Sequence, residues 1–353
     1  MITVGVDAHK DTHTLGALDQ TGRSRGTLCV PARTRGHTEA IAWATALAAE
    51  HGDGQLRWGV EDCRHVTGLL ERDLIAAGQH VVRVPTVLSS GYRRSTSRTR
   101  GKSDPIDAAA IARATQSEQH LPVVTEQFLD QDIAVLREIS RARGQLVRDR
   151  TRQINRLIGD LHRYNPDLAA GHLGTLKAID ALRGKLRRRT ADDAGREMLR
   201  ELLLEALTAL RVLNVRINDL ECQMRHHPVI VASPLLGIPG CGEVTAAQIL
   251  STISPISSYR SVHAFTSAAS VVPIPIASGR SQSMRVNTGG NRRLNAAFWT
   301  IAEYQSRHQG TRGYDLYQAA RTRGKSEKSA LRIVRCNITK YAYRLLKNHA
   351  PLT

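Results

Sequence analysis

Short apolar runs and amphipathic stretches alternate along residues 1–84. Residues 36–50 and 65–77 carry apolar side chains at helical spacing, which predicts two helices. The stretch Asp19-Gln-Thr-Gly22 predicts a turn. Runs of apolar and β-branched residues predict strands at residues 2–6, 12–18, 26–30, 56–60 and 80–84. The predicted order is three strands, a helix, a strand, a helix and a strand.

This order resembles the RNase H-like (RuvC-like) arrangement, in which the first strand packs centrally beside the fourth. Asp7 comes directly after the first predicted strand, and Glu61 comes directly after the fourth. On neighbouring strands, these two carboxylates would lie close enough to share a cation. The alternative is that each is an ordinary surface acid, because the chain contains 32 aspartates and glutamates.

A polar, basic segment without periodicity occupies residues 92–102, and we predict a loop there. Because it follows the predicted sheet directly, its cations would lie near the candidate acids and could bind a phosphate. The candidate nucleic-acid-binding residues of this segment are Arg93, Arg94, Arg98, Arg100 and Lys102.

Residues 103–113 predict a helix that begins with two acids. Ser103 or Asp104 can cap this helix, and Pro105 fits its first turn. Asp104 and Asp107 are three residues apart, so both project from one face of the helix toward the same point. Acids are also common in a first turn because they suit the helix dipole. Local sequence leaves these two interpretations open.

The middle of the chain predicts a long helical arm. Residues 136–161 place apolar side chains at helical spacing beside a basic face, and a break follows at residues 165–174. Residues 193–227 then alternate apolar steps of four and three, which indicates a coiled coil. A helix packed inside a bundle is the alternative. Pairing within one chain or between chains stays open, and an exposed seam would favour a homodimer. The candidate phosphate contacts of the basic face are Arg148, Arg152 and Arg156.

Residues 235–250 resemble a helix-hairpin-helix DNA-binding element. The tight turn Gly237-Ile-Pro-Gly240 leaves backbone N–H groups free at the start of the next helix, which suits a phosphate. Gly240 and Gly242 are the candidate contact residues of this turn. The alternative is a plain turn between two helices.

Residues 272–294 are rich in proline, serine, glycine and arginine. A lone serine is usually only a polar residue, but here a basic surrounding and the flanking Gly279 favour a nucleophile. A helix is predicted over residues 294–304, and a last basic amphipathic helix over residues 329–347. The candidate hydroxyl nucleophiles are Ser278, Ser281 and Ser283. The candidate nucleic-acid contacts of this region are Arg280, Arg292 and Arg293.

The balance of charge narrows the class of partner. The chain of 353 residues contains 50 lysines and arginines against 32 acids, a formal net charge of +18, and arginine dominates. Because arginine offers a planar fork to phosphate, nucleic acid is the first partner to consider, ahead of an anionic membrane surface. Carboxylates gathered in such a basic chain suggest Mg²⁺ chemistry on a nucleic-acid phosphate.

Composition adds limits on class and compartment. A hydrophobic content of 41% supports real cores, with room for two or three domains. The chain has no apolar run near the length of about 18 residues that a membrane span requires, and no charged-then-apolar leader opens it. We therefore expect a cytoplasmic protein with no membrane partner. Its five cysteines are scattered without a C-x-x-C pair, which predicts reduced thiols rather than a zinc site.

Taken together, these motifs resemble the insertion sequence 110 family of transposases along nearly the whole chain. Members of that family have an N-terminal RuvC-like DEDD domain and a C-terminal transposase domain. The matching N-terminal residues are Gly5-Val-Asp7 with His9-Lys10, Glu61, and Lys102-Ser-Asp-Pro-Ile-Asp107. The matching later residues are the basic helix around Leu136, the hairpin Gly237-Ile-Pro-Gly-Cys-Gly242, and the pair Ser278-Gly279.

The resemblance implies a DNA transposase that cuts and rejoins DNA, guided by a structured non-coding RNA. It implies that Ser278 attacks a DNA phosphate and forms a covalent phosphoserine link. It also implies that both sites act as one composite centre, completed between the subunits of a homodimer or homotetramer. The Mg²⁺ ligands that it implies are Asp7, Glu61, Asp104 and Asp107. The domains that it implies are a RuvC-like domain at residues 1–125, a helical coiled-coil domain at 126–228 and a transposase domain at 229–353.

Two stretches depart from the family pattern. The chain reads Ser270-Val-Val-Pro273 where the family usually has a Gly-Leu-x-Pro-like run. It reads Thr288-Gly-Gly-Asn291 where the family commonly has a lysine before Gly-Asn. Ser281 therefore stays as a second candidate nucleophile. Two further functions stay open: a RuvC-like nuclease that uses a metal-activated water, and a nucleic-acid-binding protein whose acids are only structural.

Overall fold

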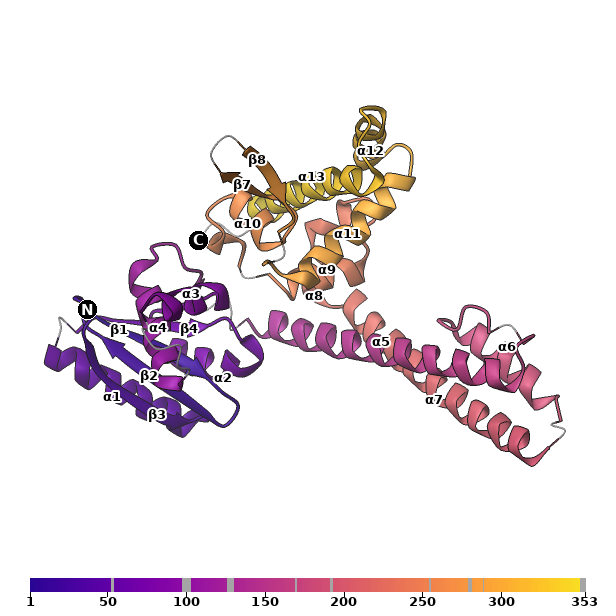
Figure 1. The fold of residues 1–353 in the computed structure, drawn as a ribbon, viewed down its shortest axis with the longest axis horizontal. Coiled ribbons are helices and arrows are strands. Elements are labelled where there is room, and N and C mark those ends of the chain that lie inside the picture. The colour runs from indigo at the N-terminus through magenta and orange to yellow at the C-terminus, as the bar shows by residue number, and fades with distance from the viewer. Residues whose placement is uncertain are drawn as a thin grey trace. The chain divides into compact units, whose positions relative to one another are not determined.

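The computed structural model divides the chain into two compact units, which differ in class. One comprises Met1–Asp130 with Ser254–Phe265, and the other comprises Gln131–Ile253 with Thr266–Thr353. The first contains an α/β sheet and the second is mostly helical (Figure 1), as the sequence predicts. The three-domain division stays a prediction. The structure describes residues 1–51, 54–96, 103–125, 130–168, 170–190, 193–253, 255–278, 281–287 and 289–349.

One mixed sheet in the order β3-β2-β1-β4-β5-β6 forms the centre of the first unit. Its strands are β1 (Ile2–Ala8), β2 (Thr12–Leu18), β3 (Ser24–Pro31), β4 (Leu56–Glu61), β5 (Val81–Val84) and β6 (Val123–Val124). The pairs β1–β2, β2–β3 and β5–β6 are antiparallel, whereas β1–β4 and β4–β5 are parallel. The predicted placement of the first strand beside the fourth is therefore confirmed.

Helices cover both faces of this sheet. They are α1 (Thr34–His51), α2 (Arg64–Ala76), α3 (Thr86–Thr96) and α4 (Asp104–Ser117). Val4 and Val6 of β1 pack in one core cluster with Ala40 and Ala44 of α1. Because successive residues of a strand point to opposite faces, Gly5 points the other way, toward α4.

Glycines on three adjacent strands allow α4 to lie directly on the sheet. A Cβ on Gly5 would overlap the backbone of Ala108, and a Cβ on Gly59 would overlap the side chain of Thr115. A Cβ on Gly16 would lie 3.1 Å from the backbone nitrogen of Ala109, tighter than ordinary van der Waals contact. These three glycines therefore decide how closely α4 approaches the sheet, and so where its first turn lies.

The prediction of a loop over residues 92–102 is wrong for residues 92–96, which belong to α3. Leu88 and Tyr92, one helical turn apart, pack against a core cluster that includes Val84 and Ile111. This apolar face begins before the basic run and continues beneath it, so the helix persists where the local composition predicts a loop. Residues 97–102 lie outside the part of the chain that the structure describes.

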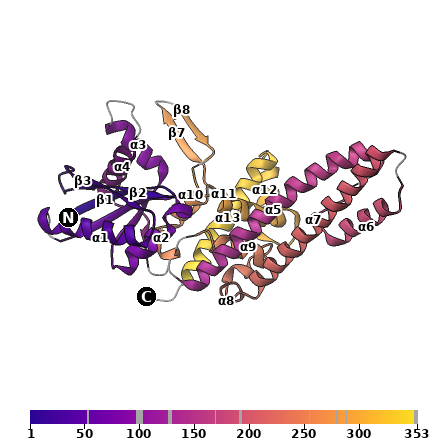
Figure 2. The same ribbon diagram turned by 90° about the horizontal axis from the view of Figure 1, so that it is seen from below.

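Two long helices of the second unit, α5 (Gln131–Tyr164) and α7 (Ala194–Arg225), lie side by side (Figures 1 and 2). They form one core cluster with α6 (Leu176–Arg187), a helix that the sequence analysis does not predict. The seam of α7 thus pairs within the chain, and the coiled-coil assignment stays a prediction. The buried residues of this seam follow steps of three and four: Leu203, Leu207, Leu210, Asn214, Ile217, Leu220 and Met224.

Asn214 is the polar member of the α7 seam. Arg150 of α5 donates from Nη1 to its Oδ1 at 3.2 Å, and its Nδ2 donates to the carbonyl of Leu210 at 3.0 Å. A polar residue inside an apolar helix seam favours one register, because a shift of α5 along α7 would break its hydrogen bond to Arg150. A second link joins Arg143 to Glu221 at 2.7 Å.

The remainder of the chain forms shorter elements. The predicted helices at residues 294–304 and 329–347 are confirmed, each within a longer helix, whereas the hairpin of β7 and β8 and the helix α12 are not predicted. A short 3₁₀ helix, η2, precedes α9. The assignment of this region as a helix-hairpin-helix element stays a prediction. The elements are α8 (Pro228–Val231), η2 (Pro234–Gly237), α9 (Glu243–Leu250), η3 (Ile256–Ser258), α10 (Val262–Ala268), β7 (Ile274–Ser278), β8 (Ser281–Arg285), α11 (Arg292–Arg307), α12 (Arg312–Thr322) and α13 (Glu327–Asn348).

No helix within the described ranges combines the length and the apolar character that crossing a lipid bilayer requires.

Candidate active site

Asp7 and Glu61 lie at the ends of neighbouring parallel strands. Val6 of β1 is paired with Val60 of β4. Asp7, which follows Val6, therefore lies beside Glu61, which follows Val60. Asp7 shares a sheet face with Gly5, and Glu61 shares it with Gly59, because each pair is two residues apart on its strand. Both carboxylates therefore point to the face that α4 covers.

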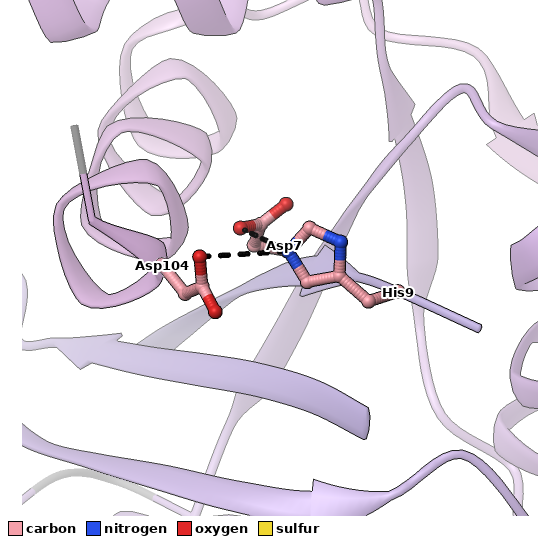
Figure 3. Close-up of side chains that lie close together, drawn as sticks. All are labelled: Asp7, His9 and Asp104. Carbon is pink, nitrogen blue, oxygen red and sulfur yellow. Dashed lines mark ion pairs between the residues drawn. The ribbon is translucent and has the colours of Figure 1, made fainter. Parts of the chain in front are cut away.

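Asp104 and Asp107 reach the same place from the first turn of α4. Ser103 is the N-cap residue in an extended conformation, and a proline follows within the first turn. Asp107 lines a pocket of about 460 Å³ together with Asp7 and Glu61. Asp104 joins them through His9, whose Nε2 lies 3.3 Å from Oδ2 of Asp7 and 3.6 Å from Oδ1 of Asp104 (Figure 3).

The pKa of Asp7 reflects its burial and the acids around it. Its residue is only 7% exposed, and this burial raises the pKa of its carboxyl above the ordinary value. His9 opposes the shift, whereas Asp107, Asp104 and Glu61 each raise the pKa of Asp7 further. Neighbouring negative charges act in this direction because they disfavour another ionised group.

The donor set fits a divalent cation. Asp7, His9 and Asp104 each offer a ligand atom, and these atoms lie within 4.8 Å of one another. Carboxylate oxygens are the ligands that Mg²⁺ prefers in proteins. A cation would also relieve the repulsion that raises the pKa of Asp7. The structure thus contains a possible acidic metal site, for which Glu61 and Asp107 are further ligands within reach of the same pocket.

The side chain of Glu61 has two polar neighbours that no sequence motif marks. Ser89 of α3 donates from Oγ to Oε1 of Glu61 at 2.6 Å, and the thiol of Cys63 lies 3.7 Å from Oε2. Burial, assisted by the charge of Glu61, raises the pKa of Cys63 to about 11, so the thiol stays protonated. No local motif marks Ser89, since its role depends on where α3 packs.

Arg93 is the predicted phosphate-binding residue that the structure brings into the acidic pocket. Its Nη1 lies 2.9 Å from Oδ1 of Asp107. Arg94, the next residue, is exposed in the last turn of α3. The other three predicted cations of this segment fall outside the described residues: Arg98, Arg100 and Lys102.

The predicted contact residues of the arm and of the turn before α9 lie in the second unit. Arg148, Arg152 and Arg156 are all exposed on α5, and Arg152 forms an ion pair with Asp149 one turn earlier. Gly240 adopts a left-handed φ of +84°, which only glycine adopts readily. Gly242 is the N-cap residue of α9.

The candidate serines lie on a hairpin. Ser278 ends β7 and is paired with Ser281, which begins β8. Gly279 and Arg280 fall outside the described residues. A sequence signal for the hairpin exists, because Ile274 and Ile276 alternate with other residues before Gly279.

Arg292 and Arg293 form the first turn of α11, where Asn291 caps the helix by accepting from two backbone nitrogens. Arg293 donates from Nη2 to Oγ of Ser140 on α5 at 3.0 Å. Burial lowers the pKa of Arg293, and the nearby charge of Arg148 lowers it further. Arg293 is therefore partly committed to packing inside its own unit.

Comparisons with known proteins agree across both units. One family model, described as a transposase and named for the DEDD transposases of IS110, matches residues 4–166. A second, described as the transposase IS116/IS110/IS902 family, matches residues 232–318. The chain is 26% identical to a 44.8 kDa protein of insertion element IS116 from Streptomyces clavuligerus, over 94% of this chain and 90% of that protein.

Two further relatives carry transposase names. A mini-circle protein of Streptomyces coelicolor, named as a candidate transposase for IS117, is 26% identical over 86% of this chain and 84% of its own length. The transposase for insertion sequence element IS1328 of Yersinia enterocolitica is 27% identical over 58% of this chain and 61% of its own length. The chain therefore belongs to the IS116/IS110/IS902 family of insertion-sequence transposases, enzymes that recombine DNA.

Proposed function

We propose that this transposase cuts and rejoins DNA by attack of Ser278 on a phosphodiester, assisted by Mg²⁺ at the acidic site. The observation that carries the proposal is the convergence of four carboxylates: Asp7, Glu61 and Asp107 line one pocket, and His9 lies between Asp7 and Asp104. The formal net charge of +18 supports a nucleic-acid substrate for such a site. The proposed ligands are Asp7, Glu61, Asp104 and Asp107.

The proposed step conserves phosphodiester bonds. The Oγ of Ser278 forms a bond to phosphorus while the bond from phosphorus to one sugar oxygen breaks. The proton of the serine hydroxyl is balanced by the proton that the released sugar hydroxyl gains. A hydroxyl of another strand then attacks the phosphoserine, which reverses the exchange and rejoins DNA without an external energy source.

The residues of the acidic pocket would position the reacting phosphate. Bound Mg²⁺ would supply Lewis-acid polarisation of the scissile phosphate. Ser89 holds one oxygen of Glu61 by its 2.6 Å hydrogen bond, which fixes the direction of that carboxylate. Arg93, paired with Asp107, offers a guanidinium that can exchange its carboxylate for a phosphate.

The RNase H-like (RuvC-like) assignment belongs to this proposal. It is supported by the central β1, paired antiparallel with β2 and parallel with β4, and by acids at the ends of both parallel strands. We further infer that the acidic site and Ser278 form one composite centre, completed between the subunits of a homodimer or homotetramer. Light scattering of the purified protein, alone and with DNA, would test the oligomeric state.

A structured guide RNA is the proposed second partner. The support is the resemblance to the insertion sequence 110 family together with an exposed row of arginines on α5 that suits RNA as well as DNA. If the proposal is correct, RNA from the protein's own element co-purifies, and ribonuclease treatment abolishes site-specific recombination. Recombination that survives complete removal of RNA would contradict the guide.

The experiment that tests the chemistry is trapping of a covalent protein–DNA adduct. The wild type and Ser281→Ala should both form the adduct, whereas Ser278→Ala should not. An adduct that disappears only in Ser281→Ala would move the nucleophile to Ser281. Full strand exchange by Ser278→Ala would refute the serine mechanism altogether.

The principal alternative is a nuclease in which a water molecule is the nucleophile. It shares the acidic site, so Glu61→Gln and Asp104→Asn abolish cleavage under both mechanisms. The two differ in the product, because a water mechanism leaves free phosphate ends and forms no adduct with the wild type. A nucleic-acid-binding protein without catalytic activity would cleave no DNA, and this would hold for the wild type as well as for the variants.

A further inference from the structure

A strongly basic pocket lies in the second unit, at the root of the hairpin that carries Ser278. Two adjoining hollows of about 310 and 560 Å³ share Ser270, Arg332 and Arg335 in their walls. Among the described residues that line the two hollows, none carries a carboxylate. The cations that line this basic pocket are Arg285, Arg292, Lys325, Lys328, Arg332, Arg335 and Lys340.

Arg335 is a buried cation without an acidic partner in this pocket. It is only 8% exposed, its Nη1 donates to Oδ1 of Asn295 at 3.0 Å, and its guanidinium carbon lies 5.6 Å from the ring centroid of Trp299. Among the described residues, its Nε has no hydrogen-bond partner. Burial, followed by the positive charge of Arg332, lowers the pKa of Arg335. A buried charge of this kind destabilises a fold unless an anion pairs with it.

A strained turn supports the same wall. Ser270 has a φ of +54° and is the only non-glycine residue with positive φ in the described ranges. Nδ2 of Asn295 donates to the carbonyls of Ala269 and Ser270 at 3.0 and 2.9 Å, while the oxygen of the same amide accepts from Arg335. Gly290 donates from its backbone nitrogen to Oγ of Ser270 at 2.7 Å. Strain of this kind persists where the surroundings hold it, and it concentrates at ligand sites.

We propose that the basic pocket binds a phosphodiester of a nucleic acid and so anchors the strand beside the hairpin of Ser278. The buried fork of Arg335 and the exposed fork of Arg332 would grip one phosphate, which supplies the acceptor that Nε lacks. Asn295 is a positioning residue, because it ties Arg335 to the strained turn. The functional meaning of this anchor rests on the proposed role of Ser278.

The pocket also has a direct structural link to the hairpin. Its walls include Pro273, which immediately precedes β7, and Arg285, the last residue of β8. The pocket therefore adjoins the base of the hairpin, where the chain enters β7 and leaves β8. The bound phosphate would thus lie near the base of the hairpin whose strand β7 ends at Ser278.

Binding of nucleic acid without metal tests the proposal separately from catalysis. Fluorescence anisotropy with short labelled single-stranded DNA, duplex DNA and single-stranded RNA would be measured in EDTA over a range of salt. Arg332→Ala and Arg335→Lys should weaken binding of at least one probe about tenfold. For Arg332→Ala, the slope of log affinity against log salt should fall by about 0.7 to 0.9, the value for one lost phosphate contact. The probe that loses affinity identifies DNA or RNA as the source of the phosphodiester.

Arg344→Ala is the matched control for Arg332→Ala. Both arginines are exposed on α13, and the same net charge is lost, but Arg344 does not line the basic pocket. The control should change affinity less than about twofold. Equal affinity and equal salt slope for Arg332→Ala and Arg344→Ala would overturn the proposal, and so would the absence of measurable binding by the wild type.

Arg335→Lys keeps the buried charge but removes the planar fork, so thermal unfolding must accompany its binding assay. If that variant unfolds, Lys328→Ala, an exposed change in the same wall, carries the test with the same expected loss. The covalent adduct of Ser278 is a separate result. A missing adduct with intact pocket effects would refute the serine chemistry alone, and an adduct without pocket effects would refute the basic pocket alone.

Discussion

The Nη1 of Arg93 lies 2.9 Å from Oδ1 of Asp107, so helix α3 places a cation of the protein itself on one of the four candidate metal ligands. A divalent cation that uses Asp107 must therefore share or displace this ion pair. The guanidinium thus lowers the local negative charge when the metal is absent. It also competes with the metal for the same carboxylate.

Arg93→Gln should consequently bind Mg²⁺ several-fold more tightly than the wild type. The physical reason is loss of a competing positive charge next to Asp107. Isothermal titration calorimetry without DNA would measure the change. Arg94→Gln, one residue further along the same helix and exposed, is the control, and equal Mg²⁺ affinities for both variants would contradict the prediction.

Asp7→Asn should raise the melting temperature in the absence of divalent cations. The pKa of Asp7 is raised in the fold, so its protonated form is favoured there and stability is lost as pH rises through that pKa. At neutral pH the amide removes this penalty. Added Mg²⁺ should stabilise the wild type but not the variant, and DNA cleavage should be lost. Asp11→Asn, a change at an exposed acid outside the pocket, should alter neither property.

Gly59→Ala should destabilise the first unit by about 2–3 kcal/mol, because its methyl group would overlap Thr115 of α4. Displacement of α4 should also weaken Mg²⁺ binding. Gly68→Ala is the matched control on α2, where an added Cβ meets nothing within 4 Å. That change should stabilise the protein by up to about 1 kcal/mol. Urea unfolding midpoints that are the same for both variants would show that α4 tolerates the methyl group.

Glu71→Ala should cost about 3 kcal/mol or more, because it removes the main partner of a buried arginine. Arg83 donates from Nη2 and Nε to the two oxygens of Glu71 at 2.6 and 3.0 Å, and Glu71 is 0% exposed. Glu138→Ala, which breaks an exposed pair with Arg141, should change stability little. Chemical denaturation measures both, and a small effect at Glu71 would mean that another group replaces its charge.

His13 should make the first unit sensitive to mild acid. Burial, and then the neighbouring His37, lower the pKa of His13 from 6.5 to about 4. The unfolded chain therefore takes up the proton first, so this contribution to stability is complete above pH 6.5 and is lost as pH falls from 6.5 toward 4. The loss should reach at most roughly 3 kcal/mol. Denaturation of wild type and His13→Gln across this range should show a shallower pH dependence in the variant, and parallel curves would assign the acid sensitivity to other groups.

The sequence predicts the parts of the first unit whose pattern is local. Runs of apolar and β-branched residues locate five of the six strands of the sheet, and the positions of Asp7 and Glu61 at the ends of two of them place both acids side by side. The pattern does not predict that α3 extends through Arg93, because the packing of Leu88 and Tyr92 against α4 and β5 decides this. The role of Ser89 follows from that same packing, so it is equally invisible in the chain.

In the second unit too, local patterns are predictable from the sequence, whereas contacts between distant segments are not. The spacing from Leu203 to Met224 predicts most of the buried seam of α7, but it leaves open whether α5 of the same chain covers that seam. The isolated polar residues are harder still. Asn295 and Arg335 are 40 positions apart, and no local signal indicates that an arginine within a basic helix is buried against an amide. Such contacts are set by the packing of whole helices.

The hydrogen bond between Arg150 and Asn214 has a consequence for distance. Moving α5 along α7 would break this hydrogen bond between side chains of the two helices, so it opposes sliding of one helix past the other. Helix α5 contains 34 residues and therefore measures roughly 50 Å. Arg148 and Arg156, the outer two of its three candidate phosphate contacts, lie roughly 12 Å apart along this helix. A single buried asparagine would in this way hold the exposed arginines of α5 at a fixed position along α7.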